Sequence, residues 1–105
     1  MALQPLTPEQ RSAALEKAFQ ARQARAQIKA ELKEGKTSLK SVLDKAVADD
    51  ALSKMKVVDL LKSMPGVGER RAHGTMEEIG IAVSRRIKGL GIHQKAALLE
   101  KFDNA

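Results

Sequence analysis

The sequence of 105 residues contains no cysteine, no tryptophan and no tyrosine, and its only aromatic residues are Phe19 and Phe102. Without cysteine, disulfides and thiolate metal sites are excluded, and a reducing intracellular environment is expected. Without more aromatic rings, the chain cannot hold unpaired bases chiefly by stacking. No apolar run approaches the roughly 18 to 20 residues that span a bilayer, and no signal peptide is recognisable. We therefore expect a cytoplasmic protein with no membrane partner.

Catalytic constellations are also missing. His73 and His93 have no second ligand at metal-binding spacing, and the adjacent Glu77 and Glu78 diverge on a helix. No serine has a nearby His and Asp in the sequence, and no Walker-type phosphate loop occurs. The sequence therefore predicts no enzyme, no metal site and no cofactor.

Charge is the most prominent property that the sequence does have. Nineteen Lys and Arg residues stand against thirteen Asp and Glu residues, which leaves a formal net charge of +6. Such a balance favours a polyanionic partner without naming one. The length leaves room for one compact domain and an extension.

A long helix is predicted over residues 8–34. Thr7-Pro8-Glu9-Gln10 is a capping-box start signal, and Gly35 supplies a left-handed stop. Leu15 and Phe19 point about half a turn away from the apolar residues near the helix end, so the front half should project from the body. We expect residues 1–35 to form a helical arm and residues 36–105 a separate domain, to which the motifs below assign a function.

One side of this helix is basic. Five of its cations lie within a sector of about 80° around the helix axis: Arg11, Arg22, Arg25, Lys29 and Lys33. They are either a solvated face or an auxiliary phosphate contact, for which the candidates are Arg22, Arg25 and Lys29.

Apolar spacing after Gly35 predicts further helices, with no alternating strand pattern. Asp49-Asp50 offers a cap for a short turn that carries Leu52 and Met55. The expected fold is all-α, with a long N-terminal helix followed by a compact helical domain. The remaining helices are predicted over 39–47, 57–64, 68–78, 81–89 and 92–102, separated by a hairpin at 65–68.

The segment 60–72 has the pattern of a helix-hairpin-helix: an apolar helix, a Pro-Gly-apolar-Gly turn and a second helix with a small residue, Ala72, four positions on. Glycines without side chains let the amides at the start of the second helix approach a phosphate, and the helix dipole adds attraction. The alternative is a tight corner selected only for packing. The candidate phosphate site comprises Pro65, Gly66, Val67, Gly68 and Arg71.

A second basic segment lies in the acid-free interval between Glu78 and Glu100. Neighbouring guanidinium groups in such a segment can clamp phosphates or enter a narrow minor groove, although a solvated charged face is the plain alternative. The candidate second surface comprises Ser84, Arg85, Arg86 and Lys88.

Taken together and in order, several motifs resemble the actinobacterial integration host factor family. The resemblance covers nearly the whole chain. It is carried by LTPEQR at 6–11, KMKV at 54–57, LL at 60–61, PGVG at 65–68, RRIKGLG at 85–91 and ALLEKF at 97–102.

This resemblance implies a helix-two-turns-helix domain like that of ribosomal protein S13. It further implies a nucleoid-associated protein that binds duplex DNA with little sequence preference, bends, bridges or compacts it, and supports phage integration. The implied partners are double-stranded DNA and a DNA-processing enzyme such as an integrase or a topoisomerase, and we expect a monomer. An RNA-binding, ribosome-associated module is the alternative, and a helical adaptor whose arm binds a protein is a third hypothesis.

Overall fold

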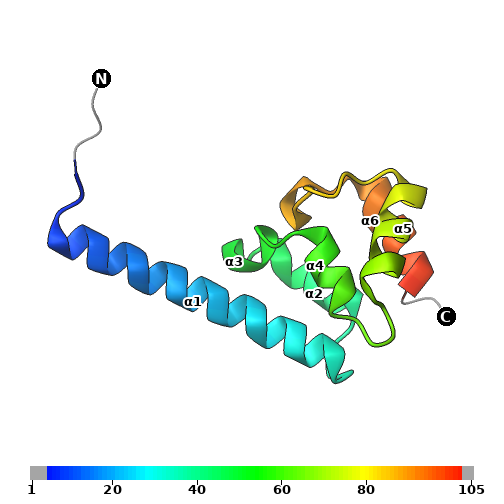
Figure 1. Cartoon of the computed structure of the whole chain (residues 1–105), viewed down its shortest axis with the longest axis horizontal. Coiled ribbons are helices and arrows are strands. Elements are labelled where there is room, and N and C mark those ends of the chain that lie inside the picture. The colour runs from blue at the N-terminus through cyan, green and yellow to red at the C-terminus, as the bar shows by residue number, and fades with distance from the viewer. Residues whose placement is uncertain (1–4, 103–105) are drawn as a thin grey trace.

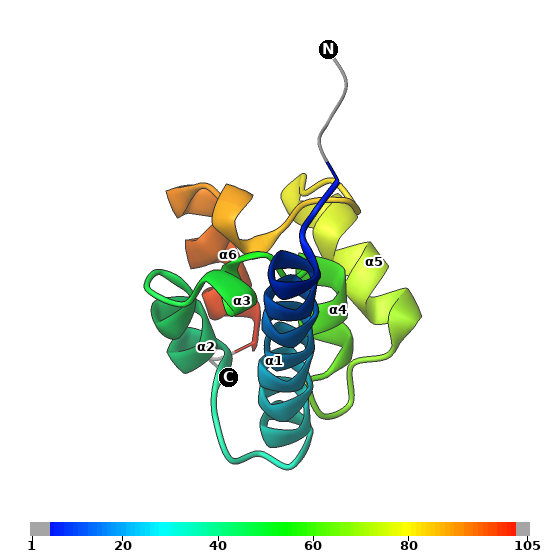
Figure 2. The same ribbon diagram turned by 90° about the vertical axis from the view of Figure 1, so that its left-hand side faces the viewer.

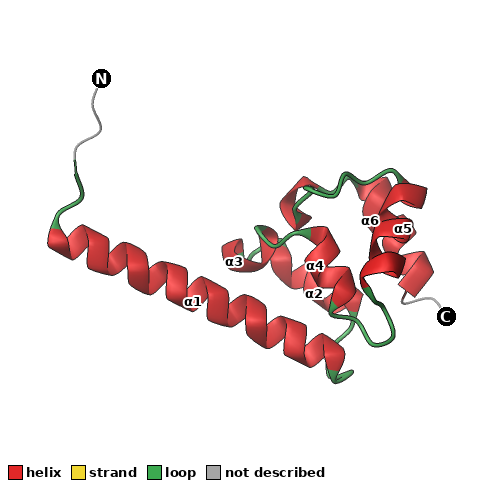
Figure 3. Cartoon of the chain, in the orientation of Figure 1, coloured by secondary structure: helices red, strands yellow, loops and turns green. Residues whose placement is uncertain are grey.

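The computed structural model describes residues 5–102, and these residues form an all-helical protein (Figures 1 and 3). The predicted fold class is confirmed: no strand occurs between residues 5 and 102, where a single isolated β-bridge joins Lys56 to Arg86. The first four residues of the expected arm and the last three of the expected domain lie outside the described residues. The elements are α1 (Pro8–Lys33), α2 (Leu39–Ala46), α3 (Asp50–Ser53), α4 (Val57–Lys62), α5 (Glu69–Ile79), the 3-10 turn η1 (Ile87–Gly89) and α6 (Ile92–Phe102).

Helix α1 begins and ends where its local signals place it. The Thr7 hydroxyl accepts the Gln10 amide at 3.1 Å, while the Gln10 side chain accepts the Thr7 amide at 3.0 Å. Past the helix, Gly35 adopts the left-handed φ of 74°. That conformation strongly favours glycine, because a Cβ atom would crowd the backbone.

Only the last turns of α1 join the core. Ile28 and Leu32 are buried there, whereas Leu15 and Phe19 are 64% and 49% exposed. Figure 1 shows the front half of α1 extending beyond the other helices, as predicted. Seen along α1, the rest of the molecule lies behind it, with α2 and α3 on one side and α4 and α5 on the other (Figure 2).

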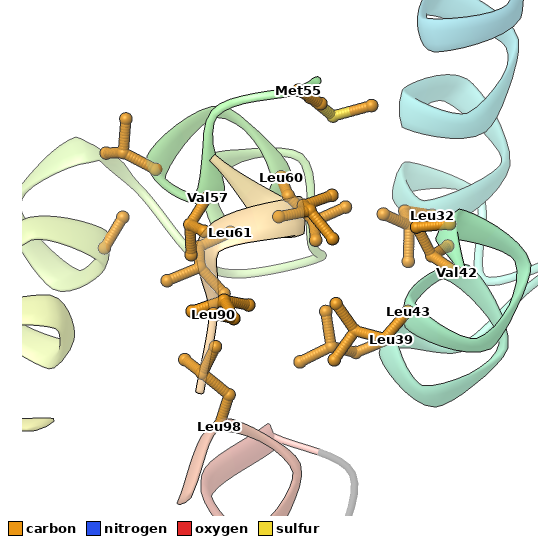
Figure 4. Close-up of a cluster of buried hydrophobic side chains, with 14 of the residues drawn as sticks. Leu32, Leu39, Val42, Leu43, Met55, Val57, Leu60, Leu61, Leu90 and Leu98 are labelled. Carbon is orange, nitrogen blue, oxygen red and sulfur yellow. The ribbon is translucent and has the colours of Figure 1, made fainter. Parts of the chain in front are cut away.

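The core collects apolar side chains from every helix (Figure 4). Leu32 of α1, Leu60 of α4 and Leu98 of α6 are essentially inaccessible to solvent. Their burial joins the end of α1 to the following helices, since each removes apolar surface from water. Within the described residues, none of the helices combines the length and the apolar character needed to span a bilayer.

Several predicted helix bounds are wrong. The helix predicted over 8–34 ends at Lys33, the one over 39–47 ends at Ala46 with Val47 exposed, and the one over 57–64 ends at Lys62. The helix predicted over 68–78 spans Glu69–Ile79. The helix predicted over 81–89 is reduced to η1, because the preceding backbone bonds across to another segment: the Val57 amide donates to the Arg85 carbonyl, and the Ile87 amide to the Met55 carbonyl, both at 2.9 Å. These long-range bonds leave residues 81–86 without helical structure.

Candidate nucleic-acid interface

The hairpin between α4 and α5 has the predicted construction. Gly66 adopts a φ of 75°, and Val67 is buried in the core beneath the turn. Ala72 is fully buried on α5, where its small side chain lets the two helices pack closely. Buried Val67 therefore anchors the inner side of the turn. Its outer surface is formed by Pro65, Gly66 and Gly68, which are all exposed.

The start of α5 is open to an external acceptor. Gly68 is the N-cap residue, no side chain caps the helix, and the amides of Glu69, Arg70 and Arg71 have no backbone acceptor among residues 5–102. A Cβ atom built on Gly68 would meet no atom within 4 Å. Free amides at the positive end of an eleven-residue helix, with open space before them, form an arrangement that suits an anion.

The charged residues of this first turn face different neighbours. The Arg71 guanidinium lies 5.6 Å from the ring centroid of Phe102, so it packs against α6 as an exposed cation–π pair. The Glu69 carboxylate lies 3.8 Å from Nε2 of His73, one turn along α5. The backbone amides, more than Arg71, are therefore the groups that the fold presents at the hairpin.

The second basic segment is held by the bridge between Lys56 and Arg86. The two bridge residues have extended backbone, whereas Lys54 is the C-cap residue of α3 and Lys88 lies in η1. Met55 and Ile87 are buried, and the cations on either side of each, Lys54 and Lys56 on one segment and Arg86 and Lys88 on the other, are exposed. The bridge thus sets two short basic segments side by side, antiparallel, with their cations outward.

These cations surround a hollow of about 440 Å³ that also reaches α1. Arg25 and Lys29 of α1 line it, which joins two of the predicted auxiliary residues to the predicted second surface. We call this feature the basic hollow. Its lining residues are Arg25, Lys29, Lys54, Met55, Lys56, Asp59, Arg86 and Lys88.

Not every predicted residue lies there. Arg22 is exposed on α1 but does not line the basic hollow. Arg85 turns to its own loop, where Nη1 donates to the Gly89 carbonyl at 2.6 Å. Ser84 is exposed in the preceding loop.

The sequence analysis did not identify Lys54 and Lys56 as site residues. The signal that could have found them is the alternation of cations with apolar residues in Lys54-Met55-Lys56, which is repeated in Arg86-Ile87-Lys88. In both segments the central apolar residue is buried and the flanking cations face solvent.

The hairpin and the basic hollow lie at opposite ends of α4. Lys56 precedes the helix and lines the hollow, whereas Ser63 follows the helix and leads into the hairpin. In Figure 1 the α4–α5 loop is at the lower edge of the domain and η1 is at the upper edge. Among residues 5–102, no three His, Asp or Glu side chains are grouped so that they could hold a metal ion.

Fold and surface together define a protein of the helix-two-turns-helix class with an open hairpin turn and a basic hollow. The family model described as S13-like H2TH domain matches residues 32–102. Curated relatives named integration host factor are 55% identical in Mycolicibacterium smegmatis and 54% identical in Mycobacterium tuberculosis, each over the full length of both chains. The relative of the same name in Streptomyces coelicolor is 53% identical over 97% of this chain and 95% of its own.

The chain belongs to the integration host factor family of actinobacteria, as its motifs predict. A solved structure of sIHF bound to an 8-bp palindromic DNA is similar in fold, with a TM-score of 0.81 and 47% sequence identity. The match covers 83% of this chain and 98% of that chain. The RNA-binding alternative receives no comparable support.

Proposed function

We propose that this chain is a nucleoid-associated protein that binds duplex DNA through its sugar-phosphate backbone and acts without catalysis. The observation that carries the proposal is the convergence of six cations on the basic hollow, with Asp59 as the one carboxylate in its lining. Close likeness to a protein solved on DNA supports duplex DNA as the partner. Contacts to phosphates carry no direct base information, so binding tolerates different sequences.

The hairpin is the other proposed phosphate site. Its open amides at Gly68 and the following turn bind one stretch of backbone, and Arg85, Arg86 and Lys88 with Ser84 bind another. In this proposal residues 36–105 supply both surfaces and residues 1–35 add auxiliary contacts. Two surfaces on one monomer let the protein bend or bridge DNA, and thereby compact it and assist phage integration.

The projecting half of α1 is exposed from residue 8 to residue 20, which leaves room for a protein partner. We propose that a DNA-processing enzyme, an integrase or a topoisomerase, uses this surface at the nucleoid in the cytoplasm. Deleting residues 1–20, which leaves the buried Ile28 and Leu32 in place, then removes the enzyme partner in a pull-down.

Salt dependence of binding to a 20-bp duplex tests the proposal. If about four to six phosphates are neutralised, the logarithm of affinity falls with the logarithm of salt concentration at a slope of roughly −4 to −5. Lys29→Gln with Lys88→Gln should reduce the slope by about 2, because each neutralised phosphate contributes about 0.9. The measurement is fluorescence anisotropy at four salt concentrations.

Lys45→Gln provides the matched control, because Lys45 is an exposed cation of α2 outside the basic hollow. Its slope should stay within error of the unsubstituted protein. A slope unchanged by the Lys29 and Lys88 substitutions would contradict the assigned surface. Equal or tighter binding to an A-form RNA duplex of the same length would favour the ribosome-associated alternative.

A further inference from the structure

We propose that the basic hollow is a binding site for a free polyphosphate, a compact run of three or more linked phosphates such as a nucleoside triphosphate carries, and that this ligand competes with DNA. The competition rests on the proposed function, whereas the site itself does not. DNA and a free polyphosphate share one chemistry, closely spaced phosphate anions, and the hollow distinguishes them by shape and by charge density.

Shape is the first argument. Three segments that are distant in sequence surround the hollow: α1, the α3–α4 connection with the start of α4, and residues 86–88 at η1. Its volume of about 440 Å³ is within the usual range for small-molecule sites, roughly 300 to 1,000 Å³. A surface that served only a DNA backbone would need a ridge or a shallow groove, because the phosphates of a duplex lie on its outside.

Rigidity is the second argument. The Arg86 guanidinium donates to the Lys54 carbonyl, and Nη1 of Arg25 donates to the Ala51 carbonyl at 3.4 Å. Both side chains are thereby held against the hollow before any ligand arrives. A guanidinium held in this way has further N–H groups free for phosphate oxygens, and a ligand gains affinity because less side-chain entropy is lost.

Uncompensated charge is the third argument. Several cations elsewhere have carboxylate partners, as in the pairs Lys36–Glu34 and Lys101–Glu78. In the hollow Lys54 pairs with Asp50, but the other five cations have no carboxylate within 4.0 Å among the described residues. Lys56 and Arg86 even occupy directly opposed bridge positions, where like charges are destabilising.

The remaining charge suggests the length of the ligand. Setting aside the paired Lys54 and subtracting the Asp59 carboxylate from the other five cations leaves about four positive charges. Three linked phosphates carry about four to five negative charges near neutral pH, because a terminal phosphate contributes up to about two. One strand of DNA presents only a single charge per ~3.4 Å of helix axis, so a backbone passing over the hollow neutralises less of it.

Binding of inorganic tripolyphosphate to the full chain tests the site directly, without DNA. Isothermal titration in magnesium-free buffer should show one site, and a thermal scan should show a melting temperature that rises with ligand concentration. Sodium sulfate at the same ionic strength serves as the comparison anion. Equal heats and equal thermal shifts with sulfate would mean non-specific screening and would overturn the site.

Matched variants locate the binding. Lys56→Gln with Lys88→Gln removes two unpaired charges from the hollow, and Lys36→Gln with Lys45→Gln removes two exposed charges elsewhere. The hollow variant should bind tripolyphosphate at least tenfold more weakly, while the control stays within about twofold. Similar weakening in both would assign the effect to net charge and overturn the site. Far-ultraviolet circular dichroism confirms that both variants are folded.

Competition is measured by displacing a labelled 20-bp duplex at constant ionic strength. Tripolyphosphate should weaken the apparent DNA affinity of the unsubstituted protein beyond the effect of sulfate, and ATP or GTP in parallel shows whether a nucleoside triphosphate is accepted. Saturable tripolyphosphate binding that displaces no DNA would overturn the competition. DNA binding without tripolyphosphate binding would overturn this inference alone. Tripolyphosphate binding without DNA binding would overturn the proposed function and the competition, and would leave the polyphosphate site standing.

Discussion

Replacing Gly68 by alanine should weaken DNA binding without harming the fold. Gly68 has a φ of −88°, which any residue adopts, and an added Cβ atom meets nothing within 4 Å. The fold therefore accepts the methyl group, and stability changes by no more than about 1 kcal/mol, because the reduced freedom of the unfolded chain is offset by alanine being a poorer N-cap than glycine. The same methyl group stands in front of the open amides of α5 and keeps a phosphate away.

The expected loss of affinity follows from the bonds at risk. A hydrogen bond from a backbone amide to a charged phosphate contributes about 1.5 to 3 kcal/mol. Losing one such bond reduces affinity by about ten- to a hundredfold, because every 1.4 kcal/mol is a factor of ten. Anisotropy titration of a 20-bp duplex measures the affinity, and thermal unfolding followed by circular dichroism measures stability.

Two other glycines provide controls with opposite outcomes. Gly66 has a φ of 75°, so alanine there costs about 1 to 2 kcal/mol in backbone strain and lowers the melting temperature. Gly74 is an exposed residue inside α5, where alanine should raise stability by about 1 kcal/mol and leave DNA affinity unchanged. A stably folded Gly68→Ala protein that binds DNA as tightly as the unsubstituted chain would refute the phosphate role of the hairpin.

Further predictions concern stability and DNA binding. Leu32→Ala should cost about 2 to 5 kcal/mol in urea unfolding, because the side chain is 1% exposed in the core. The hydrogen bond and charge of Lys54 lower the pKa of Asp50 from its usual 3.8, so the pair stabilises the fold above that pH and is lost as the pH falls through the lowered value. The melting-temperature difference between the unsubstituted protein and Asp50→Asn should accordingly shrink below about pH 4; a constant difference would contradict this. Arg85→Ala with Arg86→Ala should weaken binding to two unrelated duplexes by a similar factor, and a loss confined to one sequence would argue against backbone contacts.

Local signals were sufficient for much of the fold. The capping box at Thr7 needs only Gln10, and the turn at Gly66 needs only its own backbone freedom and the buried Val67 beside it. Each of these features is decided within a few residues. The sequence therefore predicted the long helix and the hairpin correctly.

The basic hollow depends on bonds between distant residues and could not be predicted in the same way. Lys54 and Lys56 reach Arg86 only because the amides of Val57 and Ile87 bond across about thirty residues of chain. The apolar spacing of residues 81–89 indicated a helix, but tertiary hydrogen bonds overrode that preference. Helix propensity depends on the local sequence, so it cannot predict which remote segments pair with each other.

Helix α4 is a fixed spacer between the two proposed phosphate sites. Its six residues give it a length of about 9 Å, and this length is fixed because the rise per residue of an α-helix is constant. One inserted residue would lengthen it by about 1.5 Å and rotate one end by about 100° relative to the other. A protein built on such a spacer tolerates a change of the exposed Lys62 more readily than a change in the number of residues of α4.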